Sequence, residues 1–125
     1  MKYKKLSILI VDDNRYYIRR MTEMLQGLDS IGQINTAENY SEAYSLIGEE
    51  EHDLVLLDIH LPDGNGMNLL KEIKESPGHT EVIMVSNSSS EYYRRQCKDL
   101  GAYYFLDKTH DFEMMPAILT EMNSC

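Results

Sequence analysis

Carboxylate, hydroxyl and ammonium side chains lie at or next to the ends of four apolar runs of this chain. Asp12 and Asp13 follow the first of these runs, Asp58 follows a later one, and Ser86 and Lys108 follow the last two. Carboxylates can act as nucleophiles towards phosphorus and as ligands of hard divalent cations. A hydroxyl and an ammonium group suit phosphoryl oxygens, because phosphoryl transfer relies on positioning and charge stabilisation. The set indicates phosphoryl chemistry if the fold brings these run ends together.

The apolar runs have the length of strands. Residues 54–57 are the clearest example, because they end at Asp58 and are followed by the turn residues of segment 62–66. An uninterrupted apolar run of this kind is typical of a strand covered by helices on both faces. Strands are predicted at residues 6–11, 31–37, 54–58, 82–85 and 103–106, of which the second is the least apolar and suits a sheet edge.

Apolar residues between these runs recur at the spacing of amphipathic helices. Asn14 suits the N-cap of the first helix, and Pro116 the first turn of the last, since a proline deeper inside would break it. Ser88 and Glu91 have the spacing of a capping box, which predicts Ser88 as the cap of the fourth helix. The first helix is expected to bury Ile18, Met21, Leu25 and Leu28, and the second and third helices to begin near Ser41 and Gly66.

Five strands that alternate with five helices predict a single doubly wound α/β domain over residues 1–125. Right-handed crossovers favour a five-stranded parallel sheet in the order 2-1-3-4-5, with helices on both faces. In that order the acids, Ser86 and Lys108 converge at the carboxyl edge of the sheet, where such folds bind ligands. Carboxylates gathered at one point repel one another, so we expect a divalent cation there, and Mg²⁺ suits one or two carboxylates and water.

Composition narrows the classes of function. The chain has 125 residues and a net charge of −9 with no basic run, which disfavours direct nucleic-acid binding by this domain. Two distant cysteines, Cys97 and Cys125, fit a reducing compartment. The apolar run at residues 6–11 is too short for a secretion signal or a membrane span. A cytoplasmic protein without membrane association is therefore expected.

The chain resembles the receiver domain of two-component response regulators (the CheY-like family) over essentially its whole length. The resemblance rests on Asp12-Asp13, on the segment Asp-Ile-His-Leu-Pro-Asp-Gly-Asn-Gly at residues 58–66, on Ser86, and on Gly-Ala-Tyr-Tyr-Phe-Leu-Asp-Lys at residues 101–108. It implies a phosphorylation-controlled signalling switch that catalyses only its own phosphoryl transfer and dephosphorylation. A downstream protein target, or an effector domain of its own, would receive the signal.

The resemblance also implies a metal site. Asp58 would accept a phosphoryl group from a sensor histidine kinase or a phosphotransfer protein. Asp13 and Asp58 would ligate Mg²⁺ directly, Asp12 would act through water, and the backbone carbonyl of His60 would complete the protein ligands.

The remaining family positions concern the switch. Lys108 would contact the phosphoryl group, and Ser86 would move towards it. Phe105 occupies the position of the family's switch aromatic, and its ring would move inward as Ser86 moves. The face around the fourth helix and the fifth strand would change as a result.

Three positions depart from the family pattern or modify it. Thr109 follows Lys108 where many relatives have proline, often in a cis linkage, and a trans bond is expected here. Asn87 follows Ser86 where a small residue is common, and it would narrow the phosphoryl site. His60, two residues after Asp58, lies where the family tunes the lifetime of the phosphoryl group, by shielding the site or by orienting water.

The other aromatic residues have two readings. Tyr92 faces away from the core stripe of its helix, and either Tyr103 or Tyr104 is expected to emerge beside it. Such a patch would suit partner docking or a homodimer, because tyrosine is enriched at interface hot spots, although scattered surface aromatics are common. The histidines at positions 52, 79 and 110 show no ligand spacing and are expected to be surface imidazoles.

Two other functions compete with the signalling switch. A hydrolase of the aspartyl-phosphate type usually needs a second Asp two residues after the nucleophile, and His60 stands there. A receiver-like interaction module that is not phosphorylated remains the main alternative, because of Asn87 and Thr109.

Overall fold

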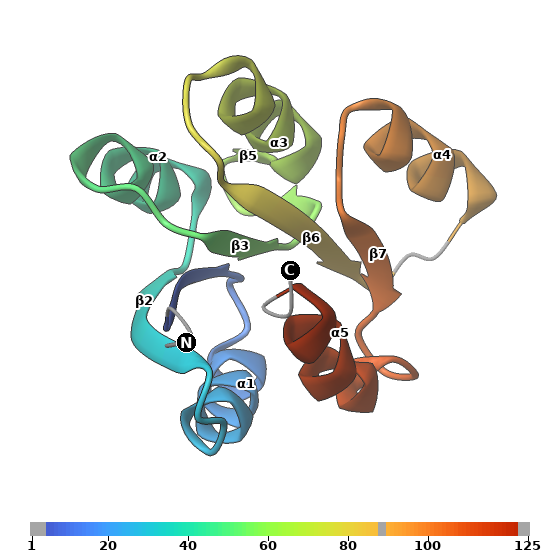
Figure 1. The fold of residues 1–125 in the computed structure, drawn as a ribbon. Helices are drawn as coiled ribbons and strands as arrows, with labels where there is room; N and C mark the ends of the chain where they lie inside the picture. Colours follow the sequence, from blue (N-terminus) through green and yellow to red (C-terminus); the bar gives the residue numbers. More distant parts are fainter. Residues whose placement is uncertain (1–4, 88–89, 123–125) are drawn as a thin grey trace.

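The computed structural model describes residues 5–87 and 90–122, and its centre is a five-stranded parallel sheet (Figure 1). The strand order β2-β1-β3-β6-β7 is the predicted 2-1-3-4-5 order under different labels. The least apolar strand, β2, lies at one edge, as predicted. The strands are β1 (Leu6–Val11), β2 (Ile31–Ala37), β3 (Leu54–Leu57), β6 (Glu81–Ser86) and β7 (Tyr104–Asp107).

Helices cover both faces of this sheet. In Figure 1, α1 and α5 lie on one side, and α2, α3 and α4 lie on the other. A two-stranded hairpin of β4 (His60–Leu61) and β5 (Gly64–Asn65) connects β3 to α3. The helices are α1 (Arg15–Gln26), α2 (Tyr40–Glu49), α3 (Gly66–Glu75), α4 (Glu91–Asp99) and α5 (Met115–Met122), the last preceded by the 3₁₀ turn η1 (Phe112–Met114).

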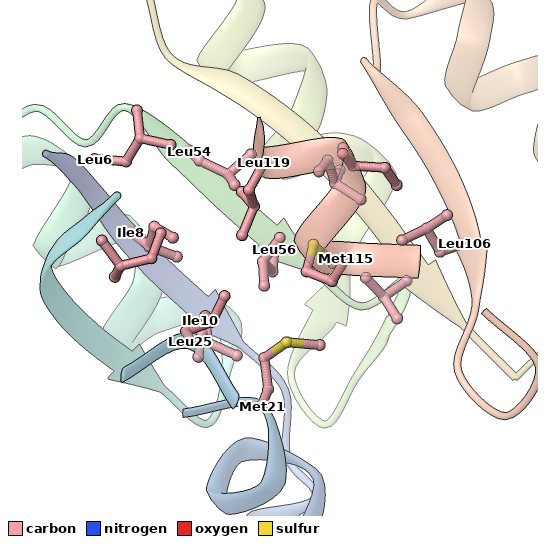
Figure 2. Close-up of a cluster of buried hydrophobic side chains, with 14 of the residues drawn as sticks. Leu6, Ile8, Ile10, Met21, Leu25, Leu54, Leu56, Leu106, Met115 and Leu119 are labelled. Atoms are coloured by element: carbon pink, nitrogen blue, oxygen red, sulfur yellow. The ribbon is translucent and has the colours of Figure 1, made fainter. Parts of the chain in front are cut away.

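The sheet separates two hydrophobic clusters, because successive side chains of a strand point to opposite faces. In β1, Ile8 and Ile10 belong to the cluster under α1 and α5, whereas Leu9 and Val11 belong to the cluster under α2, α3 and α4. Figure 2 shows the first cluster, in which Met21 and Leu25 of α1 and Met115 and Leu119 of α5 meet the strands. Both faces of β3 are fully buried, which explains its uninterrupted apolar sequence.

Helix starts follow the predicted capping chemistry, with one correction. The side chain of Asn14 accepts from the backbone N–H of Tyr17 (3.1 Å), and Pro116 is in the first turn of α5. The fourth helix is capped by Ser90, whose Oγ accepts from Tyr93 N–H at 3.2 Å, and not by Ser88. Ser88 itself lies outside the described residues, and the extended backbone of Ser90 marks the start of α4.

Two further predictions about side chains were wrong. His52 is only 2% exposed. Its carbonyl accepts from Thr80 Oγ1 (2.6 Å), and its Nε2 lies 3.0 Å from Asn35 Nδ2. Tyr103 and Tyr104 are partly buried against the α1–α5 cluster, and both hydroxyls donate to Glu121 of α5. They therefore do not form the predicted exposed patch, whereas Tyr92 is 65% exposed as expected, and His79 and His110 are exposed.

Within residues 5–87 and 90–122, no helix combines the length and apolar character that a bilayer crossing requires.

Candidate functional site

Three carboxylates meet at the carboxyl edge of the sheet. Asp12 follows β1 and Asp58 follows the neighbouring strand β3, where Val11 pairs with Leu57. Their backbone N–H groups donate to Ala37 and Val11 carbonyls, respectively, at 3.0 Å each, and so continue the strand ladders. Oxygen atoms of Asp12, Asp13 and Asp58 all lie within 4.8 Å of one another, with Asp13 exposed and the other two buried.

Lys108 joins this cluster from the last strand. Its Nζ lies 2.5 Å from Asp12 Oδ2 and 3.2 Å from Asp58 Oδ2, and its side chain is 8% exposed. Burial alone would lower the pKa of Lys108. The hydrogen bonds that Lys108 donates to Asp12 and Asp58, together with the charges of these carboxylates, outweigh burial and hold the pKa above its ordinary value. Lys108 is thus a charged ammonium group that bridges two buried carboxylates.

Burial also shifts the pKa of the neighbouring carboxylate. It raises the pKa of Asp12, and the charge of Asp58 adds to this effect, although Lys108 and the backbone N–H of Asn14 oppose it. The resting site contains three acids and one nearby cation, and is therefore short of positive charge. Hard oxygen ligands in this arrangement fit a divalent cation such as Mg²⁺.

The loop after Asp58 turns tightly around the site. Gly66 N–H donates to the Ile59 carbonyl at 2.6 Å, and Asn65 Oδ1 accepts from Met67 N–H at 2.8 Å to cap α3. His60 N–H lies 3.3 Å from Asp58 Oδ1. The exposed His60 ring projects to α4, where it meets the Tyr93 ring edge-on with centroids 5.7 Å apart.

The two expected switch residues lie on the neighbouring strands. Ser86 ends β6 and is fully buried, and its carbonyl accepts from Lys108 N–H at 3.0 Å. Phe105 of β7 is partly buried against the cluster under α2, α3 and α4. The guanidinium of Arg94 on α4 lies 4.9 Å from the Phe105 ring centroid and donates to the Phe105 carbonyl at 3.3 Å. Asn87 is exposed directly after Ser86.

A hydrogen-bonded turn directly after β7 carries Lys108. Asp107 Oδ1 accepts from Thr109 N–H and His110 N–H at 2.9 Å each, and Asp111 Oδ2 accepts from Asp107 N–H at 2.8 Å. The bond between Lys108 and Thr109 is trans, as expected. Sequence reasoning missed Asp107 and Asp111, although acids one residue before and three residues after Lys108 are a recognisable signal for such a turn.

Sequence comparison places this chain in a family. The model of the response regulator receiver domain matches residues 8–120. The chain belongs to this family. A protein-glutamate methylesterase/protein-glutamine glutaminase from Desulfotalea psychrophila is 33% identical over 110 residues, which are 86% of this chain and 30% of that protein. The transcriptional regulatory protein MalR of Bacillus subtilis is 28% identical over 116 residues, which are 93% of this chain and 49% of MalR.

Structural comparison agrees with the receiver fold. The CheX-CheY-BeF₃-Mg²⁺ complex from Borrelia burgdorferi is similar with a TM-score of 0.85 and 26% identity, over 95% of this chain and 90% of that chain. This receiver domain spans less than half the length of the two curated relatives named above.

Proposed function

We propose that this receiver domain is a Mg²⁺-dependent phosphoacceptor in two-component signalling, with Asp58 as the residue that is phosphorylated. The supporting observation is the placement of Lys108, whose ammonium group contacts the Asp58 carboxylate inside the acid cluster. An oxygen of Asp58 attacks the phosphorus of a phosphohistidine on a histidine kinase or phosphotransfer protein. The phosphorus–nitrogen bond breaks as the acyl phosphate forms, and the imidazole leaves with its electron pair.

The acids of the cluster hold the cation in this proposal. Asp13 and Asp58 would be the direct carboxylate ligands, Asp12 would act through water, and the His60 carbonyl would complete the protein set. The cation supplies positive charge that screens the carboxylates from the incoming phosphoryl group. Lys108 provides the second positive charge, and it moves from Asp12 to a phosphoryl oxygen.

The signal leaves the site through Ser86 and Phe105. A phosphoryl group adds charge and acceptor oxygens at Asp58, so that the Ser86 hydroxyl and Lys108 gain partners there. About 5.5 kcal/mol of differential stabilisation converts a mostly inactive population into a mostly active one. Charge-assisted hydrogen bonds contribute about 1.5–3 kcal/mol each, so about two bonds at the upper end of this range, or about four at the lower end, reach that value. Inward movement of Phe105 would disturb its contact with Arg94, and so reach α4.

Intact mass tests the phosphoacceptor role directly. The chain is incubated with Mg²⁺ and a small phosphodonor such as acetyl phosphate, and we expect one added phosphoryl mass. Asp58→Asn should abolish it, whereas Asp63→Asn, in the same loop but outside the acid cluster, should keep it. Mg²⁺ binding without any added mass would contradict the proposal and would favour an interaction module that is not phosphorylated.

A further inference from the structure

The ring of Tyr17 lies against the ammonium group of Lys108. Tyr17 is in the first turn of α1 and is 8% exposed, and the Lys108 Nζ is 4.8 Å from the centroid of its ring. A cation at this distance from an aromatic ring is attracted by the ring quadrupole, by about 0.5–1 kcal/mol at exposed sites and about 2 kcal/mol when desolvated. Because Lys108 is buried, its contact belongs to the stronger end of this range.

The backbone of Tyr17 is connected to the acid cluster through Asn14. Asn14 N–H donates to Asp12 Oδ1 at 2.9 Å, and Asn14 Oδ1 accepts from Tyr17 N–H at 3.1 Å. The start of α1 is therefore fixed relative to the carboxylate that binds Lys108 most closely.

A second aromatic residue holds the ring from the other side. Phe112 of η1 meets Tyr17 edge-on with centroids 6.2 Å apart, and the guanidinium of Arg20 lies 4.4 Å from the Phe112 centroid. Phe112 follows the turn that carries Lys108, so the Tyr17 ring contacts both Lys108 and the segment that follows it. Tyr17 thus occupies a built site and is not a chance neighbour.

The ring leaves the polar partners of Lys108 free to exchange. It attracts the ammonium group through the ring quadrupole and not through a conventional hydrogen bond. The cation–π attraction depends only weakly on the exact direction of the ammonium group. It can therefore persist if Lys108 moves from Asp12 to a phosphoryl oxygen. The side chain therefore keeps one contact while it changes the other.

We propose that Tyr17 is a positioning residue that holds the Lys108 ammonium group over the Asp12–Asp58 cluster during phosphoryl transfer. This inference rests on the phosphoacceptor function proposed above. Tyr17 touches neither the phosphodonor nor the reacting atoms, and it acts through Lys108.

Rate measurements with three variants test this role. Acetyl phosphate and Mg²⁺ are added, and phosphorylation is followed by intact mass. Tyr17→Leu should slow the reaction by about 2- to 30-fold, which is the rate equivalent of the lost cation–π attraction. Tyr17→Phe keeps the ring and should restore the rate to near that of the parent chain. Tyr16→Leu, on the exposed neighbour in the same helical turn, should change nothing.

A double-mutant cycle separates positioning from general destabilisation. In a Lys108→Met background, Tyr17→Leu should cause no additional loss of rate, because no ammonium group remains to be positioned. Equal losses in both backgrounds, or an unchanged rate in Tyr17→Leu, would overturn the proposal.

A measurement on the parent chain covers the case in which Tyr17→Leu does not fold. The ring should shift the NMR resonances of the Lys108 ε-methylene protons away from ordinary lysine values, and Tyr17→Phe should retain this shift. Ordinary lysine values in the folded parent chain would refute the placement. If the parent chain takes up no phosphoryl group, the proposed function fails, and the NMR shift still decides whether Tyr17 holds Lys108.

Discussion

A Cβ atom at Gly66 would lie 2.0 Å from the backbone carbonyl oxygen of Asp58. No real Cβ contact is that short, and both partners would be backbone or backbone-attached atoms, so neither can rotate away. The loop after Asp58 therefore closes onto the start of α3 only when residue 66 has no side chain.

Gly66→Ala should destabilise the domain by about 3 kcal/mol or more, because the Asp58 backbone must shift away from its strand ladder. Urea unfolding measures the change. Gly48→Ala is the matched control, since a Cβ in that part of α2 meets nothing within 4 Å. It should stabilise by about 0.5–1 kcal/mol through helix propensity. Equal effects of the two substitutions would contradict the close approach at Asp58.

Divalent cations should stabilise the resting domain, because they neutralise the acid cluster that Lys108 alone does not balance. At a Mg²⁺ concentration of 100 times the dissociation constant, the free energy of unfolding should rise by about 2.7 kcal/mol. Urea midpoints with and without Mg²⁺ measure this. Asp13→Asn should weaken the response, and Asp29→Asn, on an exposed turn, should leave it intact. A midpoint that does not change with Mg²⁺ would argue against the metal site.

Burial of His52 should make stability depend on pH. Burial lowers the pKa of His52, although the charges of Glu50 and Asp53 oppose the effect. Below the unfolded-state pKa of about 6.5, the unfolded chain binds the proton first, so the free energy of unfolding falls with falling pH. The slope is at most about 1.4 kcal/mol per pH unit. His52→Gln should flatten the profile between pH 7 and pH 5 (about the imidazole range), and His79→Gln should not. An unchanged slope in His52→Gln would contradict the assignment.

The edge-on contact of His60 with Tyr93 should couple the loop after Asp58 to α4. Aromatic pairs of this geometry contribute about 0.5–1.5 kcal/mol beyond their burial. A double-mutant cycle with His60→Ala and Tyr93→Ala, followed by urea unfolding, should give a coupling energy in this range. The same cycle with the exposed neighbour Tyr92 in place of Tyr93 should give a value near zero. Additive effects for the first pair would exclude the coupling.

Much of the fold could be predicted because apolar runs indicate the strands and the helical spacing of apolar residues indicates the helices. The bounds of β1 and β2 and the start of α3 agree with the prediction to the residue. The parallel order followed from connection rules, and it is what brings Asp12, Asp13 and Asp58 together at one edge. For carboxylates that directly follow apolar strands, the spacing in the sequence was sufficient to predict their place at the sheet edge.

The errors concern residues whose environment comes from distant segments. The predicted stripe of α1 included Ile18 and Leu28, which are partly buried, and omitted Tyr17, whose ring is enclosed by Phe112 and Lys108 from the far end of the chain. His52 looked like a surface residue because Asn35 and Thr80, its polar partners, are remote in sequence. Amphipathic side chains such as Tyr and His take either environment, so a local pattern does not decide between them.

The sheet that separates the two hydrophobic clusters also divides the machinery around Asp58. Tyr17 belongs to the cluster under α1 and α5, whereas Phe105 packs under α2, α3 and α4, and Lys108 and Ser86 stand at the edge that both layers share. In the proposed switch, modification of Asp58 would therefore affect both faces of the sheet at the same time. A partner protein bound to either face would respond to the same modification through different contacts. Substitutions in one layer could therefore alter the response on one face and leave the response on the other face unchanged.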